Sequence, residues 1–254
     1  MVATPGGVRT IVRAGEVMEL LADARDGMTA GALATAAGLP LPTVHRLLRT
    51  LVAGGHARQG PGRRYWPGPR WIRLGAVAGR ALGATAQPFL ARMVEATGET
   101  ANLALLEGDV VVYLAQAPSR HSVRMFTEIG RRVHPHCTGV GKALLAGMED
   151  ERVREIVARA GMEPMTDRTL TDLPALLADL ASVRARGWAT DDGEQEVGVR
   201  CLAVRVPHAT LPVALSVSGP EGRVTHEAIA RHGPVLAKIA SSYARALADG
   251  RAAR

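Results

Sequence analysis

The chain has 254 residues, which is enough for two domains of ordinary size. Its 47% hydrophobic and 22% charged residues are typical of a globular protein and exclude a disordered one. No apolar run approaches the roughly 20 residues that cross a bilayer, residues 1–7 lack the pattern of a secretory signal, and two cysteines are too few for a disulfide framework. We expect a cytoplasmic protein that does not bind a membrane.

The positive charge is concentrated in the first third of the chain. Residues 1–86 contain 11 arginines and 4 acidic residues, whereas residues 87–254 contain 20 basic and 20 acidic residues. No Asp or Glu lies between Asp26 and Glu95, although nine arginines do. An arginine-rich proteome would explain the choice of Arg over Lys, but not the missing acids. This segregation predicts a polyanion-binding module joined to a neutral domain.

A helix-turn-helix pattern follows a first amphipathic helix at residues 8–24. Thr29 is placed to cap a short helix from Ala30 to Ala37, and Gly38 provides the sharp turn after it. A second helix begins near Pro42, with Val44, Leu47 and Leu48 facing inward. Its outward face then carries residue types that pair with base edges and phosphates in the major groove, and these are Thr43, His45, Arg46, Arg49 and Thr50.

A β-hairpin is predicted directly behind this pair of helices. Residues 56–59 and 63–66 flank the turn Gly60-Pro61-Gly62. A hairpin in this position is a wing, and Arg58, Arg63 and Arg64 on it would contact the phosphate backbone or the minor groove. Residues 70–86 then have helical spacing and predict a linker helix whose apolar stripe packs on its own domain or on a second subunit.

The remaining residues predict a mixed domain from 87 to 254. Helices are expected at residues 87–98, 139–148, 149–160, 173–186 and 225–247. Strands are expected at residues 101–106, 110–115, 123–127, 188–191, 199–206 and 213–218. Strands with helices at both ends indicate an α+β domain with a sensor-like sheet.

Several sequence runs in this order resemble the isocitrate-lyase-regulator (IclR) family of bacterial transcription factors. They are Leu47-Leu48-Arg49-Thr50-Leu51, Tyr65-Trp66-Pro67-Gly68-Pro69-Arg70, Gly130-Arg131-Arg132, Gly139 to Ala146, Arg184 to Ala189 and Gly198 to Ala203. The resemblance covers residues 8 to 248 and implies a winged helix-turn-helix domain at 1–69, a linker helix at 70–86 and a GAF-related effector-binding domain at 87–254. It also implies homodimers or homotetramers that bind palindromic operators, usually as repressors. The family often has a Lys-Ser pair where this chain has Leu41 and Pro42, so a helix cap and one or two phosphate contacts are expected to be absent or relocated.

The resemblance also places an effector pocket between the sheet and the helix that begins at Gly139. Matched motif by motif, its residues are Gly139, Val140, Asp191, Cys201, Ser216 and Ser218. The residue chemistry agrees, because a helix start suits a carboxylate and because Ser216 and Ser218 alternate along a strand and so share one face. We hypothesise a small anionic ligand such as glyoxylate or pyruvate. The alternative within the family is a regulator of aromatic-acid catabolism.

Three other functions fit parts of the sequence less well. His134, His136 and Cys137 are weak candidates for a metal site, because their adjacency is not a closed zinc spacing and a fourth ligand is not evident. Cys201 as a nucleophile would make an enzyme, but it lies in an apolar strand where thiol reactivity falls. A purely architectural DNA-binding protein would not need the neutral second domain. We expect no enzyme activity and no cofactor.

Overall fold

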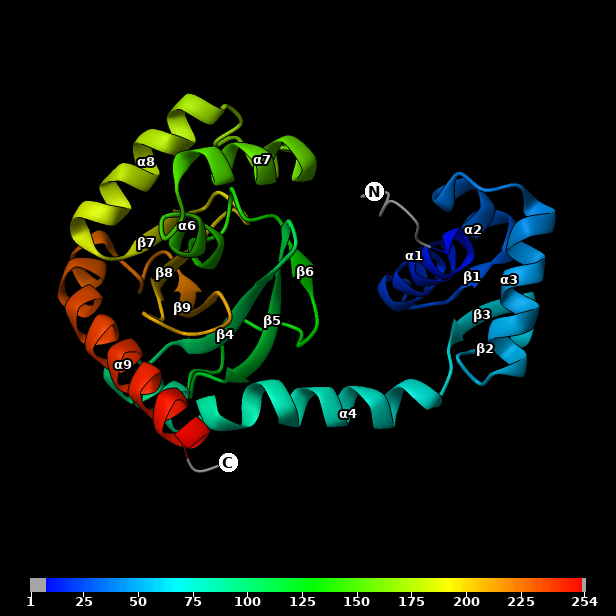
Figure 1. The fold of residues 1–254 in the computed structure, drawn as a ribbon, viewed down its shortest axis with the longest axis horizontal. Helices are drawn as coiled ribbons and strands as arrows, with labels where there is room; N and C mark the ends of the chain where they lie inside the picture. Colours follow the sequence, from blue (N-terminus) through cyan, green and yellow to red (C-terminus); the bar gives the residue numbers. More distant parts are fainter. Residues whose placement is uncertain (1–7, 253–254) are drawn as a thin grey trace. The chain divides into compact units, whose positions relative to one another are not determined.

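The computed structural model describes residues 8–252, so residues 1–7 and 253–254 lie outside it, as do the side chains of residues 80–82, 84 and 250–252. The chain divides into two compact units, one up to Arg80 and the other from Ala81. In chain order the elements of the first unit are α1 (Arg9–Asp23), β1 (Met28–Thr29), α2 (Ala30–Ala37), α3 (Leu41–Ala53), β2 (Ala57–Gln59), the 3-10 turn η1 (Pro61–Arg63), β3 (Arg64–Pro67) and α4 (Arg70–Gly83), which extends into the second unit (Figure 1).

The first unit has the predicted helix-turn-helix. The Thr29 hydroxyl accepts from the N–H of Ala32 at 3.2 Å, and Gly38 ends α2 with a φ of +61°, which a side chain would disfavour. Val44 and Leu48 of α3 pack with Val17 of α1 in one apolar core. The hairpin β2–β3 is also confirmed, and β1 adds a third antiparallel strand in the order β1-β3-β2. The sequence pattern does not indicate β1, because two residues are too few for a period.

The second unit is built on one antiparallel sheet of six strands in the order β6-β5-β4-β9-β8-β7. Its elements are η2 (Ala84–Ala86), α5 (Gln87–Thr97), β4 (Thr100–Glu107), β5 (Val110–Ala117), β6 (Arg132–Val133), α6 (Gly139–Leu145), α7 (Asp150–Ala160), α8 (Leu173–Arg186), β7 (Ala189–Asp192), β8 (Val199–Arg205), β9 (Val213–Pro220) and α9 (His226–Ala252). The α+β class with a winged helix-turn-helix and a sensor-like domain is therefore confirmed.

Two apolar layers cover the two faces of this sheet. On one face Leu215 and Val217 pack with helices α5 and α9. On the other face Ala203 and Ala214 pack with α6, α7 and α8 (Figure 1). Alternation along β8 and β9 therefore sends successive side chains to opposite layers, whereas β5 has an irregularity that places the consecutive residues Leu114 and Ala115 in the same layer. No helix of the described chain is both long and apolar enough to cross a membrane.

The strand predicted at residues 123–127 is wrong. This segment has no ladder pairing, and side chains of β4 and β5 bind its carbonyl groups instead: Thr100 Oγ1 donates to Met125 O and Gln116 Nε2 donates to Thr127 O. The free edge of β5 pairs instead with β6. Two helix ends also differ, since α6 stops at Leu145 rather than 148 and α9 continues beyond 247.

Candidate DNA-binding surface and effector site

Helix α3 presents the predicted recognition residues on its outward side. His45, Arg46, Arg49 and Thr50 are exposed, and Thr43 is half-buried. The helix begins without a side-chain cap, as the Leu41-Pro42 departure predicts, because Pro40 occupies the cap position. The amphipathic pattern that buries its apolar side therefore leaves two arginines and a histidine free to contact a ligand outside the protein.

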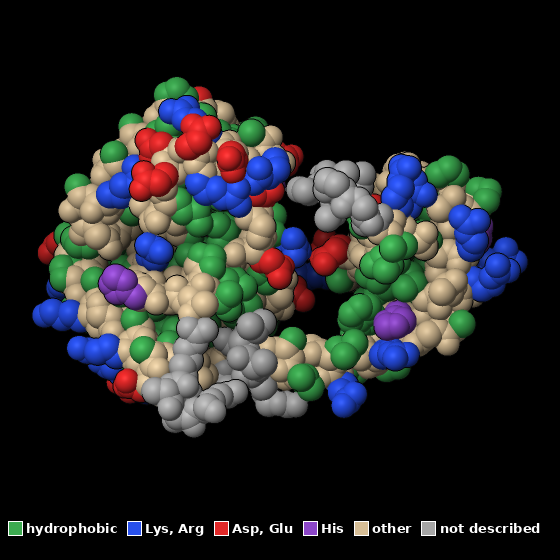
Figure 2. Space-filling view, viewed as in Figure 1, with side chains coloured by type: hydrophobic (Ala, Val, Ile, Leu, Met, Phe, Trp, Pro, Cys, Tyr) green, Lys and Arg blue, Asp and Glu red, His purple; other side chains and the backbone are tan. Residues whose placement is uncertain are grey.

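A hollow of about 680 Å³ lies between α3 and the wing. Its lining comprises Pro42, His45, Arg46, Leu48, Arg49, Val52, Gln59 and Tyr65. Gln59 and Tyr65 were not among the predicted contacts, and their alternation on paired strands β2 and β3 is the signal that could have indicated them. In Figure 2 the blue Lys and Arg side chains along the α3 edge have no acidic neighbour, so the surface suits a polyanion.

The three wing arginines have different environments. Arg63 is exposed at the tip, where its φ of +55° lies in the left-handed region. Arg58 lies 4.9 Å from the ring centroid of Trp66, and Arg64 Nη1 donates to Gly27 O at 2.9 Å. Arg64 therefore helps to hold β3 against the turn before β1, whereas Arg63 has its full guanidinium available to solvent.

The predicted effector residues lie together on the α6 side of the sheet. Strand register places Ser218 opposite Cys201, and Cys201 opposite Asp191, so β9, β8 and β7 contribute to one row. Ser216 lies on the same face, one pleat along β9. All four side chains are buried.

Helix α6 begins directly over this row. A Cβ atom added to Gly139 would lie 2.9 Å from Cys201 Sγ, so only glycine permits this approach. Val140 is fully buried in the layer between α6 and the sheet. Burial raises the pKa of Cys201 to about 12, and the Asp191 carboxylate adds to this rise. Cys201 therefore stays a neutral thiol on this buried face, where its reactivity is low.

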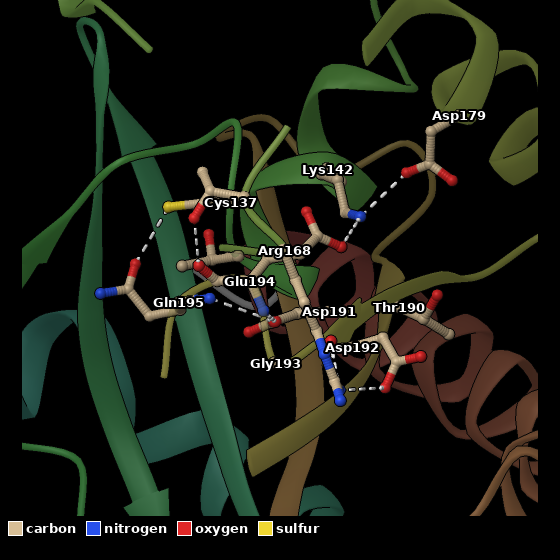
Figure 3. A network of polar contacts seen from close by, with 12 residues as sticks. Cys137, Lys142, Arg168, Asp179, Thr190, Asp191, Asp192, Gly193, Glu194 and Gln195 are labelled. Atoms are coloured by element: carbon tan, nitrogen blue, oxygen red, sulfur yellow. Dashed lines mark hydrogen bonds and ion pairs between the residues drawn. The ribbon is translucent and has the colours of Figure 1, made fainter. Parts of the chain in front are cut away.

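A buried lysine, which the sequence patterns did not single out, fixes the loop beside Asp191. Lys142 Nζ of α6 lies 2.5 Å from Glu194 Oε1 and 2.9 Å from Asp179 Oδ2 (Figure 3). Burial opposes its charge, but the two carboxylates raise the pKa of Lys142 above its ordinary value. Asp191 Oδ1 accepts from the backbone N–H groups of Glu194 and Gln195, so the ion pairs and the Asp191 carboxylate belong to one network. A lysine within the glycine-rich apolar run 139–146 was the available signal.

Asp191 makes stability depend on pH. Burial raises the pKa of this carboxyl to about 7, and the two backbone N–H groups only partly oppose the rise. Between about pH 4 and about pH 7 the folded protein keeps a proton that the unfolded chain loses, so the free energy of unfolding falls by up to about 4 kcal/mol as the pH rises through this window.

We expect Asp191→Asn to reduce this decline, because an amide does not titrate, and to leave a smaller one from Glu194, whose pKa is also raised by burial. Urea unfolding at pH values from 5 to 8 measures it. The matched control is Asp167→Asn, which changes an exposed carboxylate and should leave the decline intact. An equally steep decline in Asp191→Asn and in the unsubstituted protein would contradict the assignment.

The weak metal candidates are near one another but do not form a ligand set. The His134 and His136 ring centroids are 5.5 Å apart, and His136 Nε2 is 3.1 Å from Glu163 O. Cys137 Sγ donates to Gln195 Oε1 at 3.1 Å. Within residues 8–252, no group of three or more His, Cys, Asp or Glu residues is placed to hold a metal ion.

Family models match both units of the chain. The IclR helix-turn-helix domain matches residues 10–61, and the C-terminal region of the bacterial transcriptional regulator IclR matches residues 75–245. The HTH-type transcriptional regulator BhcR of Paracoccus denitrificans is 39% identical over 225 residues, which cover 87% of this chain and 80% of that protein. The transcriptional repressor IclR of Escherichia coli is 34% identical over 242 residues, which cover 92% of this chain and 88% of that protein.

A solved structure gives the same result for the fold. The IclR transcriptional regulator of Alicyclobacillus acidocaldarius aligns with a TM-score of 0.81 and 27% identity, covering 95% of this chain and 99% of that one. The chain belongs to the IclR family: it is a DNA-binding transcriptional regulator with an effector-binding C-terminal domain, and not an enzyme.

Proposed function

We propose that this regulator is a repressor. Residues 1–69 bind operator DNA, residues 70–86 form the helix that links the two domains, and residues 87–254 bind the effector. Arg46 and Arg49, with Thr43, His45 and Thr50, read the major groove, while Arg58, Arg63 and Arg64 position the wing on the backbone. The exposure of α3 beside an acid-free wing supports this division. The Escherichia coli relative is named a repressor, which supports repression of transcription by this chain and not activation. The protein would act in the cytoplasm.

The effector we propose is a small anionic oxoacid such as glyoxylate or pyruvate. The observation that carries this proposal is the convergence of Asp191, Cys201, Ser216 and Ser218 on one sheet face beneath Gly139 and Val140. Hydroxyl, thiol and carboxyl groups are close together there, while bulky aromatic side chains that could stack on a ring are scarce in the whole sequence. Regulation would follow if the ligand binds more tightly to one of two arrangements of the two units.

A second copy of the chain is the proposed partner in DNA binding, since a dimer sets the spacing of two half-sites. Helix α4 leaves Ile72, Leu74 and Val77 between 45% and 75% exposed, and Ile11 of α1 is 70% exposed. Apolar side chains at this density on two helices support an interface between copies. Sedimentation velocity at micromolar concentration measures the mass, and a single-chain mass would contradict a dimer.

Isothermal titration calorimetry with glyoxylate, pyruvate and benzoate tests the effector class. We expect the two oxoacids to bind and Ser218→Ala to lower their affinity about tenfold, the order of one hydrogen bond to a charged group. Ser241→Ala is the matched control, because Ser241 is exposed on α9 and its hydroxyl donates to its own helix. Binding of benzoate alone would favour an aromatic-acid regulator and overturn the oxoacid proposal.

A further inference from the structure

Asn102 is the sole asparagine in the sequence, and it is fully buried. It lies on β4, where strand register places it opposite Gln116 of β5 on one side and Ser216 of β9 on the other. Asn102 therefore belongs to the sheet face that carries Ser216, Ser218 and Cys201. None of the effector residues suggested by the sequence lies on β4 or β5.

A neighbouring amide fixes the orientation of the Asn102 side chain. Gln116 Nε2 donates to Asn102 Oδ1 at 3.2 Å and also to Thr127 O at 3.2 Å. The oxygen of Asn102 is thus engaged, and its NH₂ group points to the other side. Within the described residues, Asn102 Nδ2 has no hydrogen-bond partner although the side chain is fully buried, and the equally buried Ser216 hydroxyl has only the Cys201 thiol as a neighbouring polar partner. Buried donors without an acceptor are costly, so an acceptor group from outside the chain is expected at this pair.

The charges on this face decide what kind of acceptor fits. Within β4 and β9 the single acidic residue is Glu107, which is exposed at the far end of β4. Asp191 lies on β7, three strands from Asn102. Glu194 lies in the loop after β7, where it forms an ion pair with Lys142. A ligand carboxylate is therefore farthest from acidic side chains of this face at the Asn102–Ser216 end.

We propose that the Asn102 NH₂ group and the Ser216 hydroxyl bind the carboxylate of the effector, so that the rest of the ligand points toward Cys201 and Asp191. Gln116 is a positioning residue that holds the Asn102 amide in the donating orientation. This inference rests on the proposed effector site, and it adds a specificity determinant from the β4–β5 side of the sheet. It predicts that small oxoacids such as glyoxylate and pyruvate bind and that their uncharged esters do not.

The unique asparagine makes a direct test available. Protein labelled with ¹⁵N at the asparagine side-chain amide gives one pair of NH₂ signals, which belong to Asn102. We expect this pair to shift on titration with glyoxylate or pyruvate and to stay unchanged with methyl pyruvate. Gln116→Ala should already move the pair in the free protein and should weaken binding.

Affinity measurements on variants give the second readout. Asn102→Ala should weaken oxoacid binding about ten- to a hundredfold, the range for a hydrogen bond to a charged group. Gln87→Ala should leave affinity unchanged, because it removes an exposed amide on α5 that donates only to a backbone carbonyl of Gln116. Thermal unfolding of each variant checks that it folds. If Asn102→Ala does not fold, the shift of the Asn102 signals in the labelled unsubstituted protein still tests the proposal.

The outcomes separate this inference from the proposed function. Calorimetric binding of an oxoacid with unmoved Asn102 signals would overturn the inference and leave the effector site standing, since a buried water would then satisfy Asn102. No calorimetric response to any oxoacid would overturn the proposed ligand class and the inference with it. Binding of methyl pyruvate as tight as that of pyruvate would exclude a carboxylate at Asn102.

Discussion

Replacing Arg46 with alanine should lower the affinity for operator DNA about 10- to 100-fold and reduce discrimination against random DNA, because a bidentate contact from Arg to a base contributes about 1–3 kcal/mol of discrimination. Arg46 is exposed on α3 and lines the hollow between this helix and the wing. Its removal should leave the helix core of Val44, Leu47 and Leu48 untouched. Fluorescence anisotropy with an operator duplex and a scrambled duplex measures both affinities.

The matched control for Arg46 is Arg63→Ala. Arg63 is exposed at the wing tip, where a contact to phosphate carries no sequence information. Its replacement should weaken binding to both duplexes alike and reduce the slope of log affinity against log salt by about 1. Equal losses on specific and random DNA for Arg46→Ala would refute the division between a reading helix and a positioning wing.

Lys142→Met should cost about 3–5 kcal/mol of unfolding free energy, because removal of one partner leaves buried charge uncompensated. Lys142 is 2% exposed, and its two carboxylate partners come from α8 and from the loop after β7. The loop carries Glu194, whose backbone N–H binds Asp191. Loss of the ammonium should therefore also weaken effector binding.

The chain provides its own control, since it has just one other lysine. Lys238 is exposed on α9, and Lys238→Met should change stability by less than about 0.5 kcal/mol, as is usual for surface substitutions. Urea unfolding followed by circular dichroism measures both variants. A Lys142→Met protein as stable as Lys238→Met would show that the ion pairs do not stabilise the fold.

The first unit was predictable in detail because its signals are local. A threonine cap, a left-handed glycine and apolar residues at helical spacing act over a few residues, and Thr29, Gly38 and Leu48 lie where those rules place them. The departure at Leu41-Pro42 likewise predicted the uncapped start of α3. Helix α8 was correct to the residue, since Asp172 caps it and Gly187 ends it.

The predictions were wrong or incomplete where contacts between residues distant in the sequence determine the secondary structure. Residues 123–127 have strand-like composition, but their carbonyl groups accept hydrogen bonds from the side chains of Thr100 and Gln116 and not from a neighbouring strand. No local sequence pattern encodes such contacts. Strands β1 and β6 are two residues long and exist through their partners β3 and β5.

The grouping of the proposed effector residues was partly predictable. Alternation on β9 gave the shared face of Ser216 and Ser218, and the family motifs gave Cys201 and Asp191. The sequence patterns did not indicate Lys142 or Asn102, because their hydrogen-bond partners, Glu194 and Gln116, lie 52 and 14 residues away. Burial of a lone lysine or asparagine is a tertiary property, which spacing along the chain does not encode.

Binding of the purified protein to the intergenic DNA upstream of its own gene, with and without an oxoacid, tests the central claim most directly. A gel-mobility titration at modest ionic strength should show retardation at nanomolar to micromolar protein, lost in part on addition of glyoxylate or pyruvate. A random fragment of equal length should require much more protein. No retardation of the upstream fragment, with or without metabolite, would contradict the claim that the arginine-rich unit binds promoter DNA under control of the second unit.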